Sequence, residues 1–225
     1  MNKDSINKKS LEKIEKYSKE LGIIEMGYTK VSKDIVFEGN ELNYSNAIVF
    51  TIPIKMTIIN EGASLQGKEY NSKLYDEFLE ITIAISNEIK KLGFKTQIIN
   101  PREKLLNLVD LAKDSGIGYK GRSGLLISEK LGPRLKIAGI LTSIENLPFN
   151  NKNTHKWIEN YCKDCKKCEE RCPEKALKEN SYIYIDNLEQ DECTGSSQGC
   201  IYCIKECPFY LNGYNNVKKE YEKIK

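Results

Sequence analysis

The sequence lacks any apolar run that approaches the roughly 18 residues needed to cross a membrane. Its N-terminus is charged rather than apolar, so we expect no secretory signal peptide, and it carries no twin-arginine signal. Lys and Arg number 35 against 32 Asp and Glu, which leaves no excess of charge to favour a nucleic-acid partner. These absences predict a soluble, cytoplasmic protein with no membrane partner.

Histidine is also scarce, because His155 is the only one in the chain. It stands close to Trp157 and a few residues before the first cysteine. A lone imidazole in that position either packs and caps locally or tunes a neighbouring metal centre. We favour local packing.

Cysteine is abundant by contrast, and all eight cysteines lie between Cys162 and Cys207. The first half-site reads C-x2-C-x2-C-x3-C-P and the second reads C-x6-C-x2-C-x3-C-P. This spacing is typical of cubane iron–sulfur clusters. Disulfides are disfavoured without a signal peptide, and structural zinc needs only paired C-x2-C motifs, with no use for three tandem cysteines followed by C-P.

The ligands of each cluster follow from the geometry of the half-sites. Three cysteines two residues apart bend the backbone around one cluster, whereas the fourth cannot fold back because the following proline sends the chain away. The fourth thiolate therefore caps the other cluster. One [4Fe–4S] cluster is assigned to Cys162, Cys165, Cys168 and Cys207. The second is assigned to Cys172, Cys193, Cys200 and Cys203.

The remaining sequence predicts alternating helices and strands around a layered α/β core. Helices are expected at 5–21, 70–92 and 102–114. Strands are expected at 23–28, 46–52, 94–99, 125–127 and 137–142, with a further apolar strand at 182–185. A polar connection is expected at 57–70, and 148–153 reads as a linker. The fold class is therefore α+β, with an α/β domain at 1–150 and a cysteine-rich domain at 151–225.

The segment 116–127 is rich in glycine, and Gly116, Gly118 and Gly121 match the pattern G-x-G-x-x-G. A dinucleotide site needs a strand before these glycines and a helix after them, whereas here a helix is expected before and a strand after. Four glycines in nine residues would let the backbone approach a large flat or anionic ligand. A plain glycine-rich turn is the alternative, and both stay open.

Three stretches, 111–127, 131–135 and 140–143, together with the two cysteine half-sites, resemble the epoxyqueuosine reductases and the corrinoid reductive dehalogenases. Weaker similarity at 21–27 and 92–96 extends this resemblance over most of the chain. The resemblance implies a nitroreductase-like α/β domain that cradles cobalamin. A bacterial-ferredoxin-like domain with two [4Fe–4S] clusters would follow it and supply electrons.

The resemblance also implies a function. A low-potential donor, a ferredoxin or flavodoxin, would reduce the clusters, and electrons would pass to a corrinoid or other cofactor that reduces a small substrate. The expected cofactor contacts are Gly116, Gly118, Lys120, Gly121, Arg122, Gly124 and Arg134. The expected proton donors are Tyr119 and Glu103. A homodimer fits the resemblance, because nitroreductase-like sheets often pair.

The sequence departs from the epoxyqueuosine reductases in two places. Their Asp-Ser/Thr-Gly-Pro-like stretch is replaced by Asn100-Pro101-Arg102-Glu103-Lys104, where Glu103 is the only stand-in for the acid. The chain also ends soon after Cys207, without the helical-repeat extension of many tRNA-acting members, so tRNA is disfavoured as a substrate. The alternative function is a non-catalytic, ferredoxin-like electron carrier that serves a partner corrinoid protein.

Overall fold

The structure is a computed structural model, and it describes residues 5–55, 64–150, 152–177, 193 and 199–224. The chain divides into two compact units. The first comprises Met1–Ile52, Tyr75–Ile117 and Lys136–Asn153, and the second comprises Pro53–Leu74, Gly118–Leu135 and Thr154–Lys225. Units defined by internal contacts need not coincide with folding domains, so the expected boundary near residue 150 stays a prediction.

A four-stranded sheet forms the centre of the first unit, with the strand order β1-β2-β6-β3. The strands are β1 (Glu25–Lys30), β2 (Asn46–Pro53), β3 (Thr96–Ile99) and β6 (Leu135–Thr142). β1 is antiparallel to β2, with Met26 opposite Phe50, and β3 is antiparallel to β6, with Ile98 opposite Ile140. The strand expected at 46–52 is thus confirmed as a central one, because its apolar run is buried on both faces.

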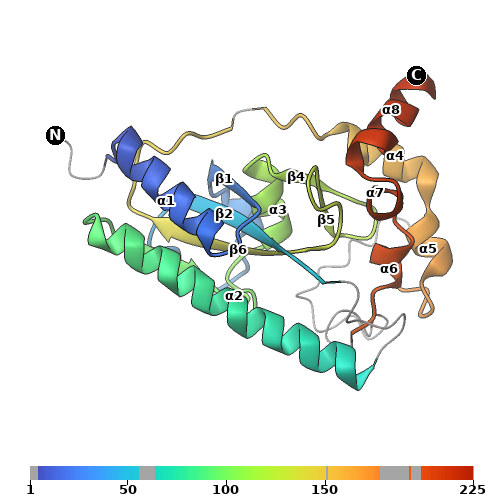
Figure 1. The fold of residues 1–225 in the computed structure, drawn as a ribbon, viewed down its shortest axis with the longest axis horizontal. Coiled ribbons are helices and arrows are strands. Elements are labelled where there is room, and N and C mark those ends of the chain that lie inside the picture. The colour runs from blue at the N-terminus through green and yellow to red at the C-terminus, as the bar shows by residue number, and fades with distance from the viewer. Residues whose placement is uncertain (1–4, 56–63, 151, 178–192, 194–198, 225) are drawn as a thin grey trace. The chain divides into compact units, whose positions relative to one another are not determined.

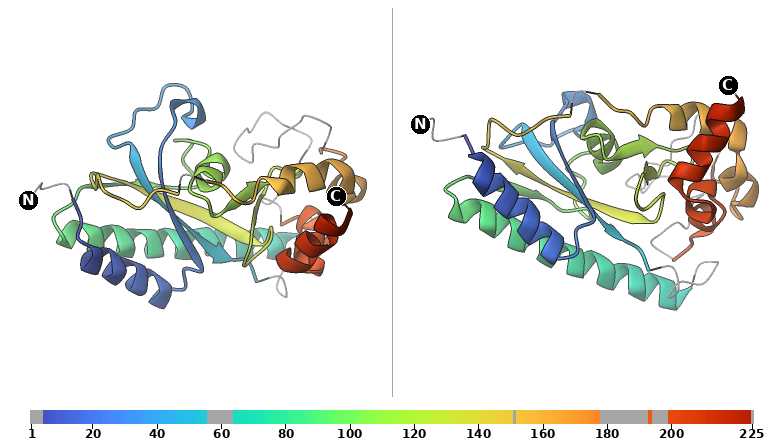
Figure 2. Two further views of the ribbon diagram at one scale, coloured as in Figure 1. Left: turned by 90° about the horizontal axis from the view of Figure 1, so that it is seen from above. Right: turned by 45° about the horizontal axis from the view of Figure 1, so that its top comes forward.

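Helices cover both faces of this sheet (Figures 1 and 2). α1 (Lys8–Glu20) and α2 (Leu65–Lys91) lie side by side on one face, and α3 (Leu108–Asp114) lies on the other. The ring of Phe78 on α2 meets that of Phe50 on β2 edge to face, with centroids 5.8 Å apart. A short 3-10 helix, η1 (Lys33–Ile35), follows β1.

Two element boundaries differ from the sequence prediction. The polar connection expected at 57–70 is wrong from Leu65 onward, where α2 already begins. Residues 57–63 of that connection lie outside the described residues. The helix expected at 102–114 begins only at Leu108. The side chain of Asn107 caps it by accepting hydrogen bonds from the N–H groups of Val109 and Asp110, both at 3.1 Å. Asn107, rather than Pro101, therefore sets the start of this helix.

The second unit combines a hairpin with short helices. The hairpin joins β4 (Gly118–Lys120) to the antiparallel β5 (Leu126–Ser128). The helices are α4 (Trp157–Cys165), α5 (Lys167–Arg171), α6 (Tyr202–Lys205), α7 (Pro208–Leu211) and α8 (Tyr214–Ile224). Their common core consists of Ile127, Ile158, Phe209, Tyr214 and Val217. The apolar strand expected at 182–185 lies outside the described residues.

In the part of the chain that the structure describes, no helix combines the length and the apolar character that crossing a membrane would require.

Candidate functional site

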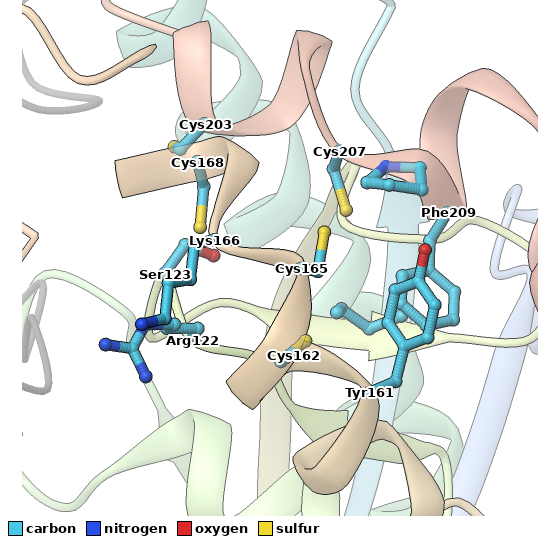
Figure 3. Close-up of a pocket in the computed structure, with 12 residues that line it drawn as sticks. Arg122, Ser123, Tyr161, Cys162, Cys165, Lys166, Cys168, Cys203, Cys207 and Phe209 are labelled. Atoms are coloured by element: carbon cyan, nitrogen blue, oxygen red, sulfur yellow. The ribbon is translucent and has the colours of Figure 1, made fainter. Parts of the chain in front are cut away.

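A pocket in the second unit is walled by cysteine side chains from several neighbouring segments (Figure 3). α4 supplies Cys162 and Cys165, α5 supplies Cys168, and Cys207 stands just before α7. The side chains of Cys165 and Cys207 point toward one another across the pocket. These are the four cysteines that the sequence assigns to one cluster, and Cys203 of the other set also lines the pocket. Ligation itself stays a prediction.

Three of the four thiols assigned to this cluster hold their protons strongly. Burial, reinforced by repulsion from the neighbouring sulfurs, raises the pKa of Cys162 and of Cys207 to about 12 and that of Cys168 to about 11. Backbone N–H groups act in the opposite direction: that of Arg122 donates to the sulfur of Cys162 and that of Phe209 to the sulfur of Cys207, whereas the Tyr210 N–H donates to the Cys207 carbonyl at 2.9 Å. Iron would displace the thiol protons, and such N–H donors stabilise the resulting thiolates. The donor set therefore fits an iron–sulfur cluster.

The second set of cysteines is electrostatically connected as well. Burial raises the pKa of Cys203 to about 12, and repulsion from Cys200, Cys168, Cys193 and Cys172 adds to the rise. Cys200, Cys193 and Cys172 are the partners that the sequence assigns to Cys203, whereas Cys168 belongs to the other set, so the division into two sets stays a prediction. None of the eight cysteines forms a disulfide, and all are partly buried. Within the described ranges, no three His, Cys, Asp or Glu side chains lie close enough together to hold a single metal ion. A [4Fe–4S] cluster does not require that spacing, because its four thiolates bind four different irons.

The glycine-rich segment forms the turn of the β4–β5 hairpin. Gly124 has a φ of 79°, and its N–H donates to the carbonyl of Gly121 at 3.0 Å. A β-carbon on Gly118 would lie 2.2 Å from the carbonyl oxygen of Ile127, and one on Gly121 would lie 2.6 Å from Ile127 Cδ1. The hairpin itself therefore requires these two glycines, and their role toward a cofactor stays a prediction. The order expected around the glycines, a helix before and a strand after, is confirmed.

The other expected cofactor contacts have neighbours within the chain. Arg122 forms an ion pair with Glu169, and the Arg134 carbonyl accepts a hydrogen bond from the Ile54 N–H at 3.0 Å. Gly116 has a φ of 78°, and a β-carbon there would collide with the side chain of Asn150. Lys120 ends β4. Their roles toward a cofactor stay predictions.

The two expected proton donors lie in different units. The Tyr119 hydroxyl donates to Glu159 at 3.2 Å, and the ring packs against the core of the second unit. Glu103 lies on an exposed turn of the first unit, where its carboxylate accepts a hydrogen bond from the Asn100 side chain at 3.3 Å. Neither side chain is shown to take part in a reaction, so both assignments stay predictions.

The first unit contains a polar pair that the sequence analysis missed. Lys136 on β6 is only 8% exposed, and its Nζ donates to the Tyr75 hydroxyl at 3.1 Å. The same Nζ stands 4.2 Å from the centre of the Tyr75 ring, and the Arg102 guanidinium lies 5.6 Å from that centre. Buried lysines are rare unless they are paired, which makes this pair a candidate functional site. The only signal in the sequence was a lysine inside an otherwise apolar strand.

His155 packs locally, as favoured from the sequence. It is 8% exposed, and its Nδ1 lies 2.6 Å from the Tyr214 hydroxyl, which also accepts a hydrogen bond from Trp157 Nε1 at 3.1 Å. Burial raises the pKa of Tyr214, so this hydroxyl remains protonated.

Comparison with known proteins identifies relatives in two enzyme families. No model of a known protein family matches the chain. The tetrachloroethene reductive dehalogenase of Dehalobacter restrictus is 27% identical over 182 residues, a match that covers 72% of this chain and 32% of that protein. The epoxyqueuosine reductase of Aliivibrio fischeri is 25% identical over 158 residues and is covered over 40% of its length. The chain thus spans about a third of the reductive dehalogenases it matches.

Solved structures of both families share the fold. The catabolic reductive dehalogenase NpRdhA in complex with 3-bromo-4-hydroxybenzoic acid has a TM-score of 0.71 at 16% identity, and the match covers 93% of this chain and 33% of that chain. The epoxyqueuosine reductase of Streptococcus thermophilus has a TM-score of 0.60 at 19% identity, and the match covers 92% of this chain and 67% of that chain. The predicted resemblance to these two families is therefore confirmed.

Proposed function

We propose that the chain is an iron–sulfur oxidoreductase that passes low-potential electrons through two [4Fe–4S] clusters to a corrinoid, for the reduction of a small substrate. The observation that carries this proposal is the pocket walled by Cys162, Cys165, Cys168 and Cys207, in a chain related to reductive dehalogenases and epoxyqueuosine reductases. One similar structure, with a TM-score of 0.68, is described as suggesting a mechanism for B12-dependent dehalogenation. That description supports the choice of a corrinoid.

In this proposal the second unit holds the electron-transfer groups. When bound, the clusters supply one-electron transfer and the corrinoid supplies the reducing centre for the substrate. The cysteines give up their protons to bind iron, and the N–H donors from Arg122 and Phe209 stabilise the sulfur charge. Tyr161, Pro208 and Phe209 line the same pocket and limit the access of water to it.

The first unit supplies a proton donor. Reductive replacement of a halogen by hydrogen consumes two electrons and one proton, and reduction of an epoxide to an alkene consumes two electrons and two protons. Tyr75 is a hydroxyl donor, and the buried Lys136 ammonium donates to its oxygen and stabilises the negative charge left when the proton departs. This pair favours an enzyme over a simple electron carrier. The substrate class is an organohalide or an epoxide.

The test is an anaerobic assay of the reconstituted protein. After loading with iron, sulfide and cob(II)alamin, the protein is reduced with titanium(III) citrate and given a halogenated alkene, a halophenol or an epoxide. Tyr75→Phe and Lys136→Gln should each lower the rate of reduction by about 10²- to 10⁴-fold, with the iron content unchanged. Tyr44→Phe, which removes a hydroxyl elsewhere in the first unit, serves as the control. Equal rates in wild type and both variants would remove the proposed donor.

A second candidate function is the non-catalytic electron carrier, and one observation favours it. Ile127 lies against the positions that β-carbons on Gly118 and Gly121 would take, so the packing of the hairpin accounts for these glycines without a cofactor. The same loading with iron, sulfide and cob(II)alamin separates the two functions. A cobalamin spectrum that co-elutes with the loaded protein supports the enzyme, whereas full clusters without bound cob(II)alamin support the carrier, with a corrinoid protein as its partner.

A further inference from the structure

Arg122 connects the β4–β5 hairpin to the cysteine pocket through two different groups. Its backbone N–H donates to the sulfur of Cys162. Its side-chain Nε forms an ion pair with the carboxylate of Glu169, and the two side chains are only 15% and 16% exposed. Arg122 itself lines the pocket (Figure 3).

Glu169 directly follows Cys168, so its carboxylate lies close to the sulfur of Cys168, one of the four sulfurs assigned to this cluster. The carboxylate repels negative charge on the Cys168 sulfur. Adding an electron to a centre bound at this pocket would meet the same repulsion, which disfavours reduction. Because the pair is largely shielded from solvent, the positive charge of Arg122 offsets that repulsion with little screening.

We propose that Arg122 sets the reduction potential of the cluster at this pocket by neutralising the charge of Glu169. This inference rests on the proposed function, since it requires a cluster held by these cysteines. Arg122 acts here as a positioning and tuning residue that needs no contact with a substrate. The guanidinium that the sequence analysis assigned to a cofactor anion thus has an anionic partner inside the chain.

The test compares variants that change the charge of the pair in opposite directions. The full chain is loaded anaerobically with iron and sulfide and titrated with dithionite while the reduced clusters are followed by EPR. Arg122→Gln leaves the Glu169 charge uncompensated and should lower the potential of one cluster. Glu169→Gln leaves the guanidinium uncompensated and should raise it. We expect each change to alter the equilibrium constant for reduction about tenfold, or about 59 mV for one electron.

Three further variants sharpen the test. The double variant Arg122→Gln/Glu169→Gln should return toward the wild-type potential, because the pair is again neutral. Arg122→Lys keeps the positive charge and should shift the potential least. Arg171→Gln is the matched control: Arg171 pairs with Glu206 in the same unit, but these side chains are 55% and 42% exposed, so solvent screens the change.

Each outcome decides the inference. Opposite shifts from Arg122→Gln and Glu169→Gln, with four iron per cluster retained, support it. Unchanged potentials, or shifts of the same sign, overturn it and leave the proposed function intact. If Arg122→Gln loses the cluster, the rise expected for Glu169→Gln carries the test alone. A wild type that binds no iron and sulfide would instead overturn the proposed function, and this inference with it.

Discussion

At the scale of single residues, Ile127 is the side chain that gives the glycine-rich hairpin its shape. Its carbonyl and its Cδ1 occupy the positions next to Gly118 and Gly121 that a β-carbon would need. Ile127 is also part of the buried core of the second unit. A change at either glycine is therefore transmitted to that core, whatever ligand the hairpin meets.

Gly121→Ala should lower the free energy of unfolding by about 1–3 kcal/mol, because the added methyl group overpacks against Ile127 Cδ1. Ile127→Val removes that carbon, so the double variant should recover part of the loss relative to the sum of the single changes. Chemical denaturation of the three variants measures this coupling. A strictly additive double variant, or a Gly121→Ala protein as stable as wild type, would contradict the packing role.

Residue-scale prediction was strong where the chemistry is local in sequence and weak where it is not. Cys162, Cys165 and Cys168 lie within seven positions of one another, so their spacing alone brings them to one pocket. Tyr75 and Lys136 are 61 residues apart, and only the fold brings the ammonium to the hydroxyl. Periodicity treated the segment around Lys136 as a core strand and gave no weight to its one charge.

At the scale of elements, the first turn of α2 meets Gly199, the residue just before Cys200. A β-carbon on Gly199, whose φ is 80°, would lie 2.6 Å from the Cα of Gly67. The two backbones touch at this point, since neither glycine has a side chain to separate them. The position of the residue preceding Cys200 is therefore fixed by α2.

Gly199→Ala should weaken the cluster assigned to Cys200 and leave the cluster of the cysteine pocket in place. The iron content should fall from about eight toward about four per chain, since only one of two cubane sites is disturbed. Gly213→Ala is the matched control, because Gly213 has a similar φ of 79° but open space around its Cα. It should cost about 1–3 kcal/mol of strain and no iron. Equal iron loss in both variants would contradict the contact.

The pairing of α1 with α2 gives a pH-dependent prediction. Hydrogen bonds from Lys13 and then Lys91 lower the pKa of Glu88 below its usual 4.5. The ionised carboxylate therefore adds stability above pH 4.5, and this contribution is lost as the pH falls through the lower folded value. Between pH 6 and pH 4, wild type should lose more unfolding free energy than Glu88→Gln, by denaturation at each pH. Glu12→Gln, in the exposed pair with Lys8, should follow the wild type.

Among the elements, strands were predicted better than helix starts. The runs around Phe50 and Ile140 are long and apolar, so burial on both faces leaves a strand as the natural assignment. The start of α3 was wrong because Pro101 suggested a first helical turn, whereas the Asn107 side chain caps the helix six residues later. α2 begins at Leu65, five residues earlier than expected, because its polar first turns show no apolar periodicity that would mark them as helical.

At the scale of the whole molecule, the two cysteine half-sites depend on each other. Cys207 and Cys203 from the second half-site both line the pocket built by the first, and Cys168 and Cys172 from the first both interact with Cys203. Cys207→Ala should therefore damage the cluster of Cys162, Cys165 and Cys168, while Cys172→Ala should damage that of Cys193, Cys200 and Cys203. EPR of the two reduced variants should show different remaining clusters. If each change spoiled only its neighbouring half-site, the ligation would not be crossed.

The central claim, that this chain is an iron–sulfur protein with two cubane clusters, is tested most directly by its metal and sulfide content. The full chain is purified or reconstituted under anaerobic conditions, and iron, acid-labile sulfide and zinc are measured per chain. Eight thiolates complete two cubane sites, so the account predicts close to eight iron and eight sulfide. Stoichiometric zinc without acid-labile sulfide would contradict it.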